Sequence, residues 1–465
     1  MKKKFERRRD DDLFSPLYGS KWDTQPIAKD KIPDHSMRSD EAFQIIHDEM
    51  DLQGNSNLNL ATFVTTWMEP EAVKLMQLGA QYNLIDEDEY PQLKVIEERI
   101  ITMEAELFNA PNAKNSVGVT TVGSSEAIML GLLAHKWKWR KHREVQGLDY
   151  YRPNVIFGAD VHTCWEKFAR YFDVEMKVIP LQKGKYTINA EDVAPLIDEN
   201  TIAVGAIVGT TFTGQVDDVK GINELLIQHK QKTGQDIPIH VDAASGGFVL
   251  PFIAPELEWD FRLEQVRSIN VSNHKFGLVY AGMGSIVFKE ESDLPKELPF
   301  EINYLGGTMQ NYSLNFSKTS SNLLAQYYNF LRFGKSGYQR IIDAVMSNAH
   351  YLEEYLQQSG YFEVLTDSKY LPVVVVKLKE RYTFSAYDIS RELNQYGWIV
   401  PAYSLPKNSE EIVVLRMVVK ENFSHDFAQK LIEDIDKVIQ TLLNDNRYKE
   451  VEIKQNSVVK VHGVC

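Results

Sequence analysis

Short apolar runs alternate with helical patterns through the middle of the chain. The segments between the runs carry apolar residues at helical spacing. The runs are rich in β-branched residues and are, in chain order, NVIFGA, EMKVIPL, TIAVGAIVGT, IPIHVDAA, SINVSN and GSIVF. Strands that alternate with helices in this way predict an α/β fold with a large, mostly parallel sheet flanked by helices.

A different pattern follows toward the C-terminus. A long helical stretch at residues 322–360 leads into two apolar runs, LPVVVVKL and EIVVLRMVV, which are separated by the helical pattern SAYDISRELNQYG. This order predicts a smaller α+β domain, which we place at residues 346–465 with a flexible tail. The large domain would occupy residues 58–345. Residues 1–57 are polar and irregular except for the helical stretch DEAFQIIHDEM, and we interpret them as an N-terminal helical arm.

Composition excludes several classes of function. The chain has 51 Lys and Arg against 65 Asp and Glu residues, and its net charge of −14 disfavours nonspecific binding to nucleic acid or anionic membranes. The two cysteines, Cys164 and Cys465, predict neither a metal site nor a disulfide framework. The basic start continues into three aspartates instead of an apolar stretch, so we expect no signal peptide, and no run is long enough to span a membrane. We expect a cytoplasmic protein with a small-molecule partner.

The stretch VGSSEA is the first candidate for ligand binding. Gly123, Ser124 and Ser125 stand where a loop opens into a helix, so backbone N–H groups and two hydroxyls would meet the positive end of the helix dipole. Such an arrangement binds phosphate. Taken alone, such a stretch is more often an ordinary N-cap, in which Ser125 would satisfy a free amide.

The stretch IPIHVDAASGGF places a carboxylate at the end of a predicted strand. Asp242 would lie at the carboxyl end of a parallel strand, where open α/β sheets bind ligands. A partly buried aspartate needs a cationic partner, and a protonated ring nitrogen would serve. The alternative is an aspartate that caps the next turn.

The stretch SNHKFG contains Lys275 directly after His274, one strand beyond Asp242. A lysine near a sheet edge is usually solvated. A lysine that forms a Schiff base must instead lose its proton, which partial desolvation, a phosphate and the neighbouring histidine would favour. Together, the phosphate loop, the ring-nitrogen aspartate and the Schiff-base lysine meet the requirements of pyridoxal 5'-phosphate.

At this point the sequence resembles the fold-type I, group II amino-acid decarboxylases, because SNHKFG matches their Ser-x-His-Lys motif. Further stretches follow in order over most of the chain and are similar to the glutamate decarboxylase family of bacteria and plants. These stretches are NLATFVTTW, IDEDEYPQ, VGSSEA, CWEKFARYFDVE, TFTGQVDD, HVDAASGGFVLPF, NYLGG, NFSKTSS, GWIVPAY, VVLRM and QNS.

The resemblance implies roles at a cofactor site. Lys275 would hold the cofactor covalently, Asp242 would pair with its ring nitrogen, and His162 would lie over its ring. Some members of the family have glutamine at the position of His162. The other implied cofactor contacts are Ser124, Ser125, Thr211, Ala244, Ser272, His274 and, from a partner subunit, Ser317.

The resemblance also implies a substrate site. Arg416 would take the α-carboxylate of the substrate with a bidentate guanidinium. Taken without the resemblance, an arginine in an apolar strand is as often part of a structural ion pair. The implied pocket for the side-chain carboxyl consists of Thr62, Phe63 and, from the neighbouring subunit, Asp86. Without the resemblance, Thr62 and Asp86 are loop and helix-cap residues.

The implied reaction is decarboxylation of L-glutamate to 4-aminobutyrate and CO2, which consumes a proton and would suit acid tolerance. Two alternatives stay open: a related decarboxylase with another substrate, such as another acidic amino acid, and a catalytically silent paralogue. Residues shared across subunits imply a homo-oligomer, a dimer at least, with a hexamer left open. We expect no metal.

The two ends of the chain carry further hypotheses. His462 in the tail VVKVHGVC is a candidate for a residue that closes the site at higher pH, although a solvated end fits equally well. The start MKKKFERRRDDD would form either an acid-sensitive helix or a charged arm. The C-terminal stretch is short and has no tryptophan, which argues against calmodulin binding.

Overall fold

The computed structural model describes residues 29–302, 309–366 and 368–448. The chain separates into two compact units, Met1–Leu58 and Asn59–Cys465. In the first unit, helix α2 spans Ser39–Met50 and confirms the helix predicted there. No residue of α2 is buried, so this helix contributes nothing to a hydrophobic core. The charged start of the chain and His462 lie outside the described residues.

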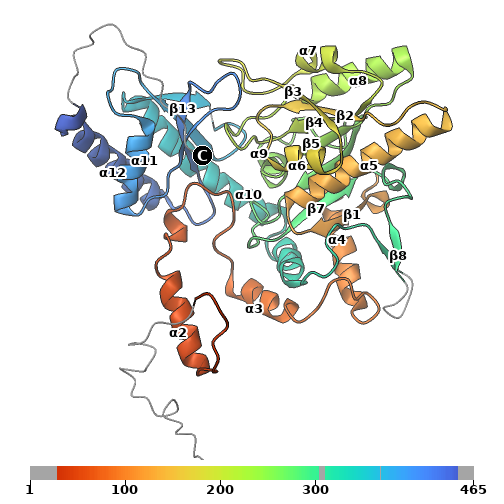
Figure 1. Cartoon of the computed structure of the whole chain (residues 1–465). Coiled ribbons are helices and arrows are strands. Elements are labelled where there is room, and N and C mark those ends of the chain that lie inside the picture. The colour runs from red at the N-terminus through yellow and green to blue at the C-terminus, as the bar shows by residue number, and fades with distance from the viewer. Residues whose placement is uncertain (1–28, 303–308, 367, 449–465) are drawn as a thin grey trace, which may run out of the picture. The chain divides into compact units, whose positions relative to one another are not determined.

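The second unit contains a seven-stranded sheet with the strand order β1-β7-β6-β5-β4-β2-β3 (Figure 1). The pairs among β2 to β6 are parallel, whereas β7 pairs antiparallel with both β1 and β6. The predicted mostly parallel α/β architecture is therefore confirmed. The strands are β1 (Val117–Thr121), β2 (Asn154–Gly158), β3 (Glu175–Ile179), β4 (Thr201–Ile207), β5 (Ile239–Asp242), β6 (Val266–Val271) and β7 (Gly284–Phe288).

The central strands are continuous apolar runs because helices cover them. Every residue of β4 is buried, as is typical of a parallel strand in the middle of such a sheet. All six runs named from the sequence form strands. Strand β1 was not predicted, since its buried Thr120 interrupts the apolar pattern. The Thr120 backbone N–H and hydroxyl both donate to Glu97, which satisfies these polar groups inside the protein.

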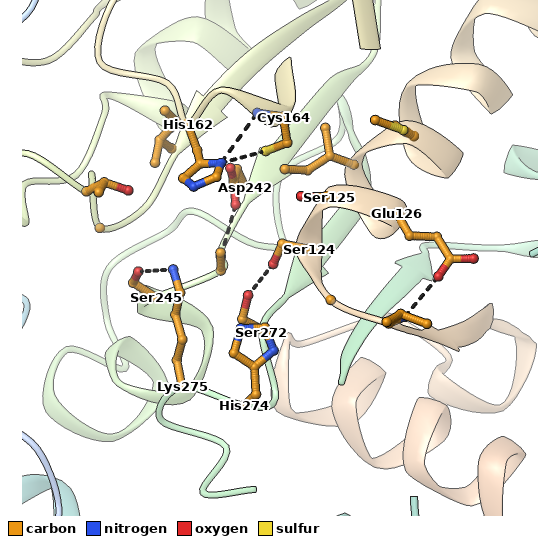
Figure 2. Close-up of a pocket in the computed structure, with 18 of the residues that line it drawn as sticks. Ser124, Ser125, Glu126, His162, Cys164, Asp242, Ser245, Ser272, His274 and Lys275 are labelled. Atoms are coloured by element: carbon orange, nitrogen blue, oxygen red, sulfur yellow. Dashed lines mark hydrogen bonds between the residues drawn. The ribbon is translucent and has the colours of Figure 1, made fainter. Parts of the chain in front are cut away.

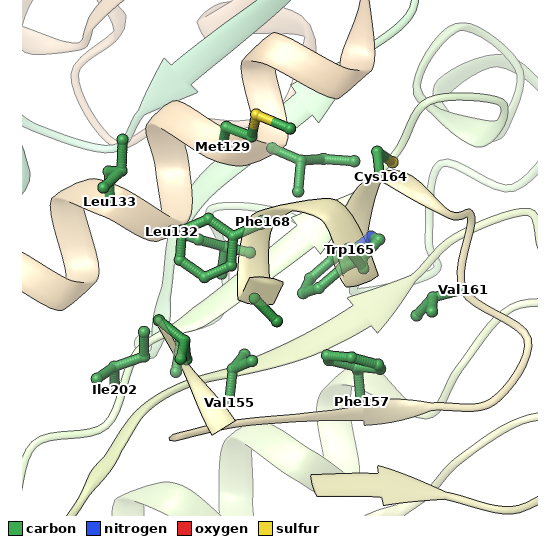
Figure 3. Close-up of a cluster of buried hydrophobic side chains, with 14 of the residues drawn as sticks. Met129, Leu132, Leu133, Val155, Phe157, Val161, Cys164, Trp165, Phe168 and Ile202 are labelled. Carbon is green, nitrogen blue, oxygen red and sulfur yellow. The ribbon is translucent and has the colours of Figure 1, made fainter. Parts of the chain in front are cut away.

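Helices pack on this sheet and form its core. Helices α5 and α6 enclose one apolar cluster against β2 and β4, with Trp165 and Phe168 fully buried (Figure 3). No described helix is long and apolar enough to cross a membrane. The helices are α3 (Pro70–Gly79), α4 (Pro91–Leu107), α5 (Ser124–Val145), α6 (Cys164–Tyr171), α7 (Ala190–Val193), α8 (Val219–Thr233) and α9 (Leu250–Ile253).

A second, antiparallel sheet forms the C-terminal part, as expected for the smaller α+β region. Its order is β10-β11-β13-β12, and helix α10 (Ser321–Gln358), which is interrupted at Gly334, contacts both this part and α3. The domain boundary placed at residue 345 falls inside α10. The remaining elements are β8 (Phe300–Ile302), β9 (Met309–Asn311), β10 (Phe362–Thr366), β11 (Val373–Leu378), α11 (Ala386–Leu393), β12 (Ala402–Ser404), β13 (Val413–Val418) and α12 (His425–Asn444).

Candidate active site

A pocket of about 460 Å³ lies at the carboxyl ends of the central strands (Figure 2). Residues that follow β1, β2, β4, β5 and β6 converge there, as expected for the ligand side of an α/β sheet. Nine of the residues named from the sequence line this one pocket: Ser124, Ser125, His162, Thr211, Asp242, Ala244, Ser272, His274 and Lys275.

One end of the pocket is formed by hydroxyls at a helix N-terminus. The side chains of Ser124, at the start of α5, and Ser272, after β6, are hydrogen-bonded to each other. Gly123 precedes the helix with φ +137°, a conformation that L side chains rarely adopt, so the turn requires glycine. His274 Nδ1 donates to the Met283 carbonyl at 2.6 Å. This end offers hydroxyls, an imidazole and the positive helix terminus to an anion.

Asp242 lies at the end of β5 and is held as an ionised acceptor. Its Oδ1 accepts from Asn270 Nδ2 at 2.9 Å and from the Ala244 backbone N–H at 3.1 Å. Its Oδ2 accepts from Trp165 Nε1 at 3.1 Å. Three donors favour the charged carboxylate, which lines the pocket while only 4% exposed. Trp165 belongs to the apolar core, so core packing helps to position this carboxylate.

Lys275 follows β6 and places its amine in the same space (Figure 2). The amine donates to Ser245 Oγ at 3.0 Å and lies 5.0 Å from the centre of the Phe63 ring. Burial lowers the pKa of Lys275 from 10.5 to about 8, against the opposing effect of Asp242. A larger fraction of the amine is therefore deprotonated near neutral pH than in an exposed lysine, and this fraction can act as a nucleophile.

His162 lines the same pocket as Asp242 and is within hydrogen-bonding reach of Cys164 (Figure 2). Its Nδ1 is 3.3 Å from Cys164 Sγ. Burial, together with the nearby Lys275 amine, lowers the pKa of His162. Burial also raises the pKa of the Cys164 thiol to about 12, so the thiol stays protonated. The imidazole is thus neutral at physiological pH and offers an apolar face to the pocket.

Arg416, on β13, is a buried cation without an acidic partner among the described residues. Its guanidinium donates to the carbonyls of Thr211 at 2.5 Å and Ala61 at 2.6 Å, and its Nε has no partner in that part of the chain. The guanidinium carbon lies 5.1 Å from the centre of the Phe63 ring, which Lys275 also contacts. Burial lowers the pKa of Arg416, so an anion near this site would be stabilised.

Five of the sequence-named residues do not line the pocket of their own chain: Thr62, Phe63, Asp86, Ser317 and Arg416. Phe63 and Arg416 lie next to it, because the Phe63 ring contacts both the Lys275 amine and the Arg416 guanidinium. Thr62 Oγ1 accepts from the Val64 backbone N–H at 3.1 Å. Asp86 accepts from Asn83 Nδ2 at 3.3 Å, just before α4. Ser317 is exposed. For Asp86 and Ser317 this placement matches the expectation that each serves a neighbouring subunit, which stays a prediction.

Other pocket residues escaped the sequence patterns. Asp160 is 1% exposed, and neither of its carboxylate oxygens has a partner among the described residues. Burial and the nearby Asp217 raise its pKa well above the ordinary value, which favours the protonated carboxyl. Glu126 accepts from the backbone N–H groups of Leu314 at 2.8 Å and Asn315 at 3.0 Å, which fixes that loop over the pocket. A lone acidic residue has no motif, and only the fold reveals these contacts.

A buried carboxyl behind the lysine loop makes stability depend on pH. Glu104 on α4 accepts from Asn273 Nδ2 at 2.7 Å and from Ser285 Oγ at 3.2 Å, and burial raises its pKa from 4.5 to about 8. Between about pH 4.5 and pH 8, Glu104 is therefore protonated in the folded state but ionised in the unfolded state. The stability gained is full below about pH 4.5 and falls by about 1.4 kcal/mol per pH unit toward pH 8.

The neutral variant Glu104→Gln should remove this dependence. We expect its melting temperature to exceed that of the parent at pH 8, with the difference shrinking as the pH falls to 5. Thermal unfolding at both pH values measures the effect. Glu98→Gln, on the exposed side of the same helix, is the matched control and should change neither value. An equal gain at both pH values would contradict the assignment.

The pocket fits pyridoxal 5'-phosphate on three observations. The hydroxyls and helix terminus at one end suit a phosphate. The ionised Asp242 suits a protonated ring nitrogen. The partly deprotonated Lys275 suits attack on an aldehyde. All three groups surround one cavity.

Comparison with known proteins gives the same class. A family model described as the pyridoxal-dependent decarboxylase conserved domain matches residues 33–379. This match defines a decarboxylase that uses pyridoxal 5'-phosphate, and the cofactor predicted from the three motifs is confirmed.

Individual relatives indicate which pyridoxal-dependent decarboxylases this chain is similar to. A glutamate decarboxylase of Petunia hybrida is 49% identical over 91% of this chain and 85% of its own length. One from Lactococcus lactis subsp. cremoris is 43% identical over 94% of this chain and 95% of its own. The solved glutamate decarboxylase of Lactobacillus brevis has a TM-score of 0.90 at 41% identity, covering 93% of this chain and 99% of that one. The chain belongs to the glutamate decarboxylase family of pyridoxal-dependent decarboxylases.

Proposed function

We propose that this chain decarboxylates L-glutamate to 4-aminobutyrate and CO2, with the net uptake of one proton. The observation that carries the choice of an amino-acid substrate is Arg416, a buried cation that has no acidic partner among the described residues and shares the Phe63 ring with Lys275. A substrate carboxylate would supply the missing negative charge. Membership of the glutamate decarboxylase family supports glutamate over other acidic amino acids.

The pocket residues would divide the work as follows. Pyridoxal 5'-phosphate supplies an electron sink for the electron pair left at the substrate Cα when CO2 departs. Lys275 would attach the cofactor and later release the product amine. Asp242 would hold a proton on the ring nitrogen. His162 would cover the ring and limit access of water to it.

The remaining pocket residues would hold and orient. Ser124, Ser125, Ser272 and His274 would bind the phosphate through hydroxyls, helix N–H groups and an imidazole. Ala244 would support the ring from the face opposite His162. Thr211 would lie near the substrate carboxylate, since its own carbonyl already positions Arg416.

A homodimer is the smallest assembly that we propose. Thr62 and Phe63 would contact the side-chain carboxyl of glutamate together with Asp86 of the partner subunit. Ser317 of the partner subunit would reach the phosphate. Close carboxyl groups raise one another's pKa, so either the Asp86 carboxyl or that of the substrate would be protonated. Association to a hexamer and a role in acid tolerance are further hypotheses that await measurement.

We also propose that the enzyme works in the cytoplasm. Cys164 is a free, buried thiol, as in proteins of reducing compartments. The charge of −14 makes a small-molecule partner more suitable than nucleic acid.

The direct test follows 4-aminobutyrate release from L-glutamate by the purified, cofactor-loaded protein from acid to neutral pH, with L-aspartate in parallel. Release from glutamate alone is expected. Decarboxylation of L-aspartate instead of L-glutamate would show that the proposed substrate is wrong. A bound cofactor without any release would favour the catalytically silent paralogue.

Changing Arg416 to lysine tests the carboxylate contact. Lysine keeps the charge but loses the planar fork, and the Thr211 and Ala61 carbonyls would compete for its single amine. We expect kcat/KM for glutamate to fall roughly a hundredfold, mainly through KM. Steady-state kinetics measure it, and Arg391→Lys, an exposed arginine on α11, serves as the control. An unchanged KM would remove Arg416 from the substrate site.

A further inference from the structure

Five buried polar side chains form one unbroken line from helix α5 to the pocket carboxylate. His135 Nε2 is 2.7 Å from Ser268 Oγ, which is 2.7 Å from His240 Nδ1. His240 Nε2 is 2.9 Å from Asn270 Oδ1, and Asn270 Nδ2 is 2.9 Å from Asp242 Oδ1. We call these five residues the Asp242 chain.

Strand register explains why these residues meet. In the parallel pair of β5 and β6, His240 lies beside Ser268 and Asp242 lies beside Asn270. Alternate residues of a strand share one face, so both pairs point to the same side of the sheet. Helix α5 covers that side and contributes His135. All five residues are at most 4% exposed, and water has little access to them.

Asp242, at the pocket end of the Asp242 chain, determines which atom donates and which accepts in each of its hydrogen bonds. An ionised carboxylate only accepts, so the Asn270 amide must turn its NH2 group to Asp242. The Asn270 oxygen then faces His240, and His240 Nε2 must carry a proton. Burial lowers the pKa of His240 to about 4, so the ring is neutral and its Nδ1 is an acceptor.

The hydrogen bonds at the other end of the Asp242 chain, at Ser268 and His135, are consistent with these donor and acceptor roles. Ser268 must donate its hydroxyl proton to His240 Nδ1, and its oxygen then accepts from His135 Nε2. A neutral His135 in that form has a bare Nδ1, and Nδ1 has no hydrogen-bond partner among the described residues. Burial lowers the pKa of His135 as well, and the charged groups facing it, Lys138 and Arg267, act in the same direction.

Packing keeps the His240 ring from turning. Gly131 of α5 lies directly against it, and a Cβ at that position would stand only 2.6 Å from His240 Cε1. The edge of Trp165, which itself donates to Asp242, packs on the ring with centroids 5.6 Å apart. The imidazole therefore has one orientation.

We propose that His240 is a positioning residue whose orientation, fixed by Ser268 and His135, directs the Asn270 donor to Asp242 and so keeps Asp242 ionised toward the ring nitrogen of the cofactor. The inference rests on the proposed role of Asp242. If the Asp242 chain ran in the opposite direction, Asn270 would present its oxygen to Asp242, and that carboxyl would have to keep a proton. His135 selects between these two directions, because the opposite one would put a proton on its buried Nδ1, which has no hydrogen-bond partner among the described residues. The hydroxyl of Ser268, which can donate either way, transmits this choice to His240.

The test uses the holoenzyme of Ser268→Ala, with Ser320→Ala as a matched control. Ser320 is also fully buried and donates to one carbonyl, that of Gly79 at 2.9 Å, outside the pocket. We expect Ser268→Ala to lower kcat about tenfold, as for the loss of one buried hydrogen bond, with KM changed less than about twofold. Ser268→Thr restores the hydroxyl and should recover most of kcat.

A spectroscopic readout separates positioning from mere destabilisation. A less protonated ring withdraws less charge from the nitrogen that Lys275 contributes. The pH midpoint of the visible absorbance change of the bound cofactor should therefore rise by about one unit in Ser268→Ala. Ser320→Ala should keep the parent midpoint even if it melts earlier. A Ser268→Ala enzyme that melts earlier but keeps the parent kcat and midpoint would overturn the inference. A parent protein without 4-aminobutyrate release would instead overturn the proposed function.

Discussion

Lys275→Ala should lower kcat for glutamate by at least about 10⁴-fold, the largest effect expected for this chain. The amine is the nucleophile of the pocket, with its pKa lowered to about 8 by burial and its position held by Ser245. Alanine removes the group that attaches the cofactor and the group that later displaces the product. Single-turnover assays and the absorbance of the bound cofactor measure both losses.

Lys275→Arg distinguishes charge from nucleophilicity. Arginine keeps a cation near Asp242 but cannot lose its proton, so the same loss of turnover is expected. Thermal unfolding of the cofactor-free variants, measured alongside, shows whether the fold remains. Retention of substantial turnover in either variant would remove Lys275 from the reaction.

Asp242→Asn should lower kcat about a thousandfold, which corresponds to about 4 kcal/mol. The asparagine has no negative charge to hold a proton on the ring nitrogen. Both oxygens of Asp242 accept hydrogen bonds, one from Trp165 and the other from Asn270 and Ala244. In the asparagine variant, the NH2 group would replace one of these oxygens and would face an N–H donor. The loss of a nearby anion should also lower the pKa of Lys275 further.

Cofactor binding and kcat at several pH values measure the Asp242 effect. Asp242→Glu is the paired control, since it keeps the charge and should retain more activity than Asp242→Asn. Equal losses in the two variants would mean that geometry, and not charge, is what the site requires. The Asp242→Asn loss should exceed that of Ser268→Ala, because the serine acts only through the Asp242 chain.

Much of the fold could be predicted from the sequence because the central strands are buried on both faces. Runs such as residues 201–207 are buried and almost wholly apolar, and their short length and β-branched residues favour a strand over a buried helix. Strand β1 was missed because its polar Thr120 is satisfied by Glu97, from a helix that precedes it. The interruption of α10 at Gly334 has no clear sign in the surrounding helical pattern.

The site residues that belong to recognisable sequence motifs could be predicted. Lys275 follows a strand, Asp242 ends one and Ser124 opens a helix, and a shared cofactor explains their order. Asp160 and His240 were not named, because a buried polar residue gains its meaning from neighbours that are distant in sequence. The Asp242 chain joins three separate segments, and only strand register brings them into line.

The antiparallel insertion of β7 between β1 and β6 has a consequence for how the protein is made. The hydroxyls of Ser124 and Ser272 meet across 148 residues of sequence, and Met283, which fixes His274, directly precedes β7. Contacts of such separation form late, since loop closure must come before them. A growing chain on the ribosome therefore has no complete phosphate site until β7 has emerged and joined the sheet. We therefore expect the cofactor to bind late in biosynthesis, and a chain truncated before β7 to leave the ribosome without it.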